Sequence, residues 1–72
     1  MSTNNHPRMQ LNNILQTYGH RPEWHVHISG SQHNPVWHAT VYIRGVQSGV
    51  VQGPNRGAAM DRAAHEALRS FR

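Results

Sequence analysis

Two stretches near the middle of the chain alternate apolar and polar residues with a period of two. On the apolar side, the first stretch has Trp24, Val26 and Ile28, and the second has Trp37, Ala39, Val41 and Ile43. Alternation of this kind is typical of strands with one buried face. It predicts an antiparallel sheet that is covered on one side only, with both tryptophans in the core.

A third strand is predicted from Val46 to Gln52. Arg44 and Gly45 stand directly before it, and a glycine that can adopt positive φ is typical of a tight hairpin turn. The second and third strands are therefore expected to form a hairpin.

Helical patterns flank the strands. A first helix is predicted from Arg8 to Tyr18, because Pro7 suits a first helical position and Gly19 suits the residue that follows a helix. Its apolar residues are Leu11, Ile14, Leu15 and Tyr18. A second helix is predicted after Gly53-Pro54-Asn55, with Asn55 as its N-cap. Its apolar stripe contains Met60, Ala64, Ala67, Leu68 and Phe71.

The predicted order is therefore α-β-β-β-α. The fold class is α+β, a three-stranded antiparallel sheet with two helices packed on one face. Residues 7–72 would form one domain, and residues 1–6 a disordered N-terminal tail. The chain contains no cysteine, no run of about 20 apolar residues and no secretory signal. We therefore expect an intracellular domain without disulfides or a membrane segment.

The net charge of the chain favours one class of partner but does not establish it. Seven arginines and three acidic residues give a net charge of +4, which favours an anionic partner. An ordinary solubilising surface explains the same charge. Arg62, Glu66 and Arg69 are also spaced to pair with one another along the second helix.

Two motifs occur in the first half of the chain. Pro7 stands four residues before Leu11-Asn12-Asn13 in the first helix, and the first strand opens on Pro22-Glu23-Trp24. Two more follow in the second half. The loop between the first two strands reads Gly30-Ser31-Gln32-His33, and Trp37 follows four residues later. The last helix opens on Arg56-Gly57-Ala58-Ala59-Met60. In these motifs the chain resembles the double-stranded RNA-binding domain family over nearly its whole length.

The resemblance implies that A-form RNA is recognised by shape. In this family the first helix, the loop between the first two strands and the start of the last helix span about 16 base pairs. They contact 2′-hydroxyl groups and phosphates, so the base sequence is hardly read. The residues that we expect to contact RNA, from the family motifs, the neighbouring turn of the first helix and the start of the last helix, are Gln10, Asn13, Gly30, Ser31, Gln32, His33, Asn55, Arg56 and Gly57.

The basic motif of the family is reduced in this chain. Gly57 and Met60 stand where the family has lysines, and only Arg56 keeps its charge. Asn13 likewise replaces a glutamate. Because each neutralised phosphate adds to affinity by counterion release, we predict weak binding, with a Kd of roughly 10⁻⁴ to 10⁻⁶ M.

The same departures support an alternative function, a protein–protein interaction module on this fold. Family members that lose these lysines tend to be used in this way. The strand from Val46 to Gln52 would then be an edge that pairs with a second copy or another protein, with Val50 and Val51 available to the partner.

The histidines suggest a zinc site as a further hypothesis. His25 and His27 share one face of their strand, and His38 would lie across from them. No carboxylate or cysteine is placed to join them, so no metal or other cofactor is predicted. The acidic residues are too scattered for a catalytic pair, and no serine has a base beside it. The domain is not expected to be an enzyme, although it could be an accessory domain of a larger RNA-processing enzyme.

Overall fold

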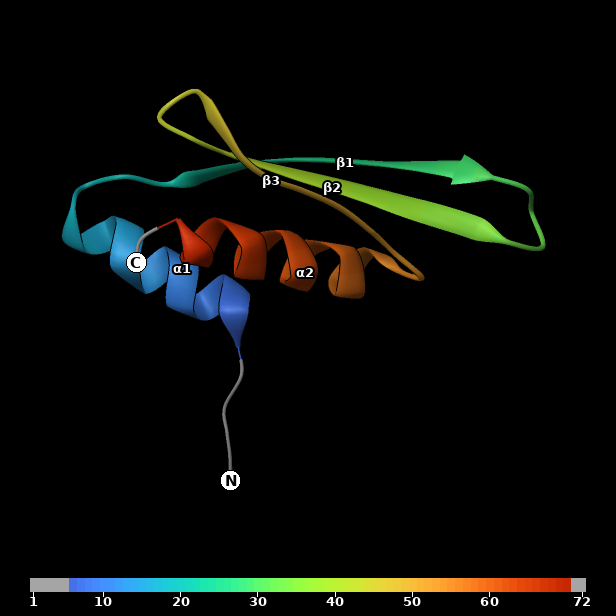
Figure 1. The fold of residues 1–72 in the computed structure, drawn as a ribbon, viewed down its shortest axis with the longest axis horizontal. Helices are drawn as coiled ribbons and strands as arrows, with labels where there is room; N and C mark the ends of the chain where they lie inside the picture. The colour runs from blue at the N-terminus through green and yellow to red at the C-terminus, as the bar shows by residue number, and fades with distance from the viewer. Residues whose placement is uncertain (1–5, 71–72) are drawn as a thin grey trace.

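The computed structural model describes residues 6–70, and its element order confirms the predicted α-β-β-β-α fold (Figure 1). The elements are α1 (Pro7–Thr17), β1 (Pro22–Gly30), β2 (Pro35–Ile43), β3 (Val46–Gly53) and α2 (Arg56–Arg69). Helix α1 begins and ends one residue earlier than predicted. Residues 1–5 of the predicted tail and Phe71 of the predicted stripe lie outside the described residues. Within residues 6–70, no helix is long and apolar enough to cross a membrane.

The three strands form one antiparallel sheet in the order β1-β2-β3. Val26 pairs with Ala39, and His27 pairs with His38. The apolar side chains of neighbouring strands therefore share one face of the sheet, and the histidines share the other, as the alternation predicts. The pairing of β2 with β3 contains a bulge at Ser48, which has no partner in the register.

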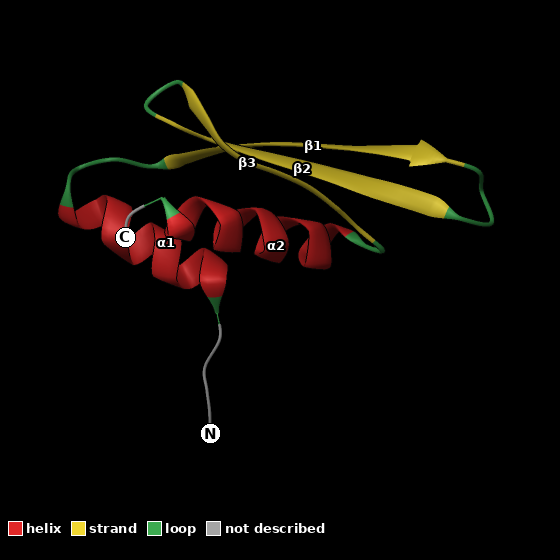
Figure 2. Ribbon diagram, in the orientation of Figure 1, coloured by secondary structure: helices red, strands yellow, loops and turns green. Residues whose placement is uncertain are grey.

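Both helices cover the apolar face of the sheet (Figure 2). Helix α2 lies against β2 and β3, and α1 lies beside α2. The core between these layers consists of Leu11, Leu15, Ala39, Val41, Ile43, Ala59, Met60, Ala63, Ala64 and Ala67. Half of these residues belong to α2, and four of those five are alanines. The helix therefore lies very close to the sheet.

Gly49 makes this close approach possible. A Cβ atom at Gly49 would lie 2.4 Å from the carbonyl oxygen of Ala63. Optimal contacts between non-bonded heavy atoms are about 3.5–4.0 Å. The backbones of β3 and α2 therefore touch at this point, and no side chain fits between them.

Several residues of the predicted apolar faces lie at the rim of the core or outside it. Ile28 is 53% exposed and Tyr18 is 67% exposed, so their predicted burial is wrong. Ile28 is near the end of β1, and β1 and β2 extend past the start of α2, so no helix covers them there (Figure 1). Tyr18 is the C-cap of α1, where that helix ends. Trp24 and Trp37 are half-buried and pack against the core from its edge.

Candidate nucleic-acid interface

The loop between β1 and β2 is held by its own serine. The N–H of Asn34 donates to the carbonyl oxygen of Ser31, at 3.2 Å, and to its hydroxyl oxygen, at 3.1 Å. These bonds close a turn over residues 31–34. The exposed side chain of His33 has no hydrogen-bond partner among residues 6–70. The imidazole is therefore accessible to a ligand, and it is Ser31 that stabilises the loop.

Gly30 opens this loop in a conformation that glycine adopts most readily. Its φ is +86°, and a Cβ atom there would lie 2.6 Å from the Asn34 carbonyl oxygen. The residues predicted for this loop therefore divide into two kinds. Gly30 and Ser31 shape the backbone, whereas Gln32 and His33 are exposed and can face a ligand.

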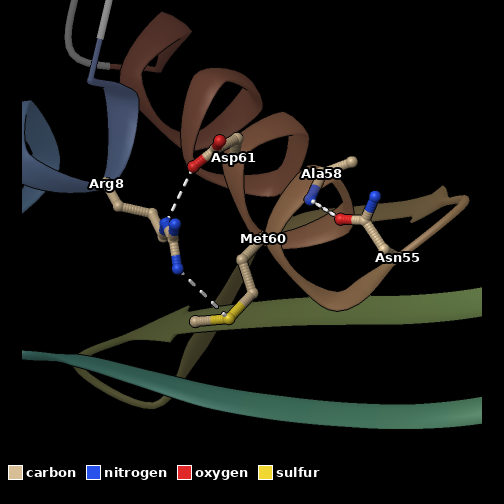
Figure 3. A network of polar contacts seen from close by, with 5 residues as sticks. All are labelled: Arg8, Asn55, Ala58, Met60 and Asp61. Carbon is tan, nitrogen blue, oxygen red and sulfur yellow. Dashed lines mark hydrogen bonds and ion pairs between the residues drawn. The ribbon is translucent and has the colours of Figure 1, made fainter.

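Asn55 caps the start of α2. The sequence predicts this residue both as the N-cap and as an RNA contact. The Oδ1 atom of Asn55 accepts a hydrogen bond from the N–H of Ala58 at 2.8 Å (Figure 3), which confirms the predicted N-cap. Within residues 6–70, the N–H groups of Arg56 and Gly57 have no acceptor. These groups and the partial positive charge of the helix end favour an anion at this position.

The side chains of the first turn of α2 leave this helix end open. Arg56 is exposed and Gly57 is half-buried. A Cβ atom at Gly57 would meet only Asn55 Oδ1, at 3.5 Å, an ordinary contact. Packing does not require glycine here, and its lack of a side chain allows an anion to approach the backbone.

Gln10 and Asn13 lie one turn apart on α1, and both are exposed. Gln10 lines an open hollow between the two helices, together with Arg62 and His65. The backbone carbonyl of Asn13 accepts a hydrogen bond from the Thr17 hydroxyl at 3.0 Å. The side-chain amide of Asn13 takes no part in this bond and is accessible from solvent.

The elements that carry the three predicted surfaces follow one another along one border of a flattened molecule. The principal extents are 41 × 34 × 16 Å, and Figure 1 looks down the shortest of them. From the right-hand end of this view, the β1–β2 loop, the start of α2 and then α1 come in succession. The fold therefore brings the elements bearing His33, Arg56 and Asn13 to a common side.

Two other arginines of α2 are engaged within the fold. Arg62 Nη1 donates to the carbonyl oxygen of Gln52 at 3.0 Å and so joins α2 to β3. Arg69 Nη1 lies 3.4 Å from the carboxylate of Glu66. The expected pairing along the helix thus occurs between Glu66 and Arg69, whereas Arg62 bonds to the neighbouring strand.

Arg8 makes a contact between the helices that we did not predict. Its Nε donates to Asp61 Oδ1 at 2.7 Å, and its Nη1 lies 3.8 Å from Met60 Sδ (Figure 3). Met60 is only 8% exposed, so position 60 is part of the core. The partners are more than 50 residues apart in sequence, and no local pattern signals such a contact.

The outer face of the sheet carries the three histidines of the zinc hypothesis. The rings of His27 and His38 are stacked, with centroids 4.5 Å apart and 6° between their planes. His25 instead bonds to Glu23, at 2.9 Å, and lies edge-on to the ring of Tyr42. Among residues 6–70 no group of three potential ligands could hold a metal ion. The described residues therefore contain no preformed site that would support the zinc hypothesis.

A family model described as the double-stranded RNA binding motif matches residues 7–70. The chain belongs to this family. It is thus a double-stranded RNA-binding domain in the general sense, a binding domain and not a catalytic one. The match spans all five elements of the fold, including the β1–β2 loop and the start of α2.

Solved structures of double-stranded RNA-binding domains share this fold. A structure of Arabidopsis HYL1, described for its implications for miRNA processing, is 29% identical with a TM-score of 0.82, covering 92% of this chain and 96% of that chain. The first double-stranded RNA-binding domain of HYL1 is 31% identical with a TM-score of 0.76, covering 86% of this chain and 90% of that chain. The second such domain of DRB4 is 26% identical with a TM-score of 0.69, covering 89% of this chain and 92% of that chain. No curated protein matches the chain significantly.

Proposed function

We propose that this domain binds double-stranded RNA by shape, weakly and with little dependence on base sequence. The observation that carries the proposal is the succession of the β1–β2 loop, the start of α2 and α1 along one side of the molecule. A duplex lying along that side meets a minor groove, a line of phosphates and a second minor groove in turn. The family membership supports the same ligand.

The loop and α1 would contact the two minor grooves. The imidazole of His33 and the side-chain amide of Gln32 offer hydrogen-bonding groups from an exposed loop of defined shape. Gln10 and Asn13 offer amides from α1. Amides both donate and accept, which suits the 2′-hydroxyl group because it does the same.

The start of α2 would contact the phosphates between the two grooves. Arg56 supplies a guanidinium, and the N–H groups of Arg56 and Gly57 supply donors at the positive end of the helix. Asn55 acts through its cap, because its side-chain oxygen already accepts from Ala58. With one exposed cation on this turn, we keep the expected Kd at roughly 10⁻⁴ to 10⁻⁶ M.

The first test compares duplex RNA with duplex DNA of the same sequence, each about 20 base pairs, by fluorescence anisotropy at low salt. We expect the domain to bind RNA at least about tenfold more tightly, because one lost 2′-hydroxyl bond costs about 1.5 kcal/mol. Equal affinities for duplex RNA and duplex DNA would mean that the domain binds only through attraction between charges, which would contradict recognition by shape.

Exposed valines on β3 favour protein–protein interaction as a second candidate function. Strand β3 is at the edge of the sheet, where Val46 is 64% and Val50 is 53% exposed. Val51, which we expected a partner to contact, is half-buried against the core because it faces α2. A concentration-dependent dimer in sedimentation, combined with no RNA binding, would favour this function.

We also infer that the domain acts inside the cell, because its proposed ligand is RNA. It would hold RNA and perform no chemistry itself, whether alone or as the accessory domain of a larger RNA-processing enzyme.

A further inference from the structure

We propose that Arg8 of α1 supplies a phosphate contact at the place where the basic motif of α2 has lost its last cation. This inference rests on the proposed function and adds a residue to its phosphate-binding surface. It starts from the contact between Arg8 and the second turn of α2, formed by Met60 and Asp61.

The position of the guanidinium follows from helix geometry. Met60 stands four residues after Arg56, and Asp61 stands four residues after Gly57, so each of these two pairs is adjacent along the surface of α2. The side chain of Met60 is buried and cannot itself reach a ligand. The guanidinium of Arg8 lies beside its sulfur (Figure 3). In the sequence of α2, Met60 comes one helical turn after the exposed Arg56. A cation thus stands next to position 60 although position 60 carries none.

The ion pair with Asp61 holds the guanidinium of Arg8 in place and leaves several of its N–H donors unused. An arginine has five N–H donors in a fixed plane. In its contacts within residues 6–70, Arg8 uses its Nε–H for Asp61 and one N–H of Nη1 for Met60, so three N–H donors remain. Its side chain is 44% exposed, so these donors can reach a ligand. A planar, pre-oriented guanidinium suits the two oxygens of a phosphate.

Asp61 has two opposing effects on such a contact. Its carboxylate orients the Arg8 side chain, which lowers the entropy lost when a phosphate binds. The same negative charge, 46% exposed, repels the phosphate. Replacing Asp61 by asparagine keeps an oxygen that can accept from Nε and removes the charge, so we expect it to tighten RNA binding.

The test measures duplex RNA affinity against salt concentration for the wild type, Arg8→Ala and Asp61→Asn. Arg69→Ala and Glu66→Gln are the matched controls, because they change an equivalent ion pair in the last turns of α2. We expect Arg8→Ala to weaken binding several-fold and to make the slope of log K against log[salt] shallower by about 0.9. Asp61→Asn should tighten binding several-fold. Both controls should match the wild type.

The sign of the two effects separates a phosphate contact from a link between the helices. If Arg8 only joins α1 to α2, then Arg8→Ala and Asp61→Asn will both weaken binding, with lower melting temperatures and an unchanged salt slope. That result, or an Arg8→Ala variant indistinguishable from Arg69→Ala, would overturn the inference and leave the proposed function intact. A wild-type domain that does not bind duplex RNA would remove both.

Discussion

Replacing Gly49 by alanine is expected to lower the melting temperature of the domain by about 12–24 °C. The new Cβ would lie 2.4 Å from the carbonyl oxygen of Ala63, so α2 must move away from β3 or the strand must bend. Ala63 lies in the middle of the core, and such a movement would loosen the whole helix layer. Overpacking costs about 3 kcal/mol at the upper end of its usual range, and each kcal/mol lowers Tm by about 4–8 °C in a domain of this size.

Gly57→Ala is the matched control, and circular dichroism during heating is the measurement. A Cβ at Gly57 meets only one side-chain oxygen, at 3.5 Å, and alanine is the better helix former. We expect this variant to melt at or slightly above the wild-type temperature. Similar melting temperatures for Gly49→Ala and Gly57→Ala would show that α2 does not lie as close to β3 as we describe.

Changing Arg56 and His33 together to alanine is expected to lower duplex RNA affinity about 100-fold, which for a weak binder abolishes measurable binding. Each change would remove one proposed hydrogen bond, from Arg56 to a phosphate or from His33 to a 2′-hydroxyl group. Two such bonds at about 1.5 kcal/mol each amount to about 3 kcal/mol. Both side chains are exposed, so the fold should not change.

A double variant of Arg44 and His20 is the control for charge, measured in the same anisotropy assay. These residues line a hollow at the C-terminal end of α1, beside the β2–β3 turn, away from the β1–β2 loop and the start of α2 (Figure 1). Changing them to alanine again removes one arginine and one histidine, but we expect little loss of affinity. Equal losses in the two double variants would attribute binding to net charge alone.

Local patterns predict most of this fold. The alternation in β1 and β2 predicts which faces pair, and the pairing of Val26 with Ala39 confirms it. Asn55 signals the start of α2 because a capping side chain acts within three residues. Such signals depend on neighbours in sequence, and they are the ones that a single sequence displays.

Contacts between distant segments could not be predicted in this way. The pairing of Arg8 with Asp61 depends on how α1 crosses α2, which no residue near either one encodes. The apolar stripe of the second helix predicts that Met60 faces the core, and its burial confirms this, but the contact of its sulfur with Arg8 has no local signal. Ile28 looks like a core residue because its strand alternates correctly, yet the helix layer ends before it.

The most direct test of the account is an NMR titration of the wild-type domain with duplex RNA of about 20 base pairs at low salt. We predict that the signals of Asn13, His33 and Arg56 shift together and saturate with a single Kd. Shifts confined to β3, or shifts at Arg56 without any at Asn13 and His33, would contradict the claim that three surfaces on one side of this domain meet one RNA duplex.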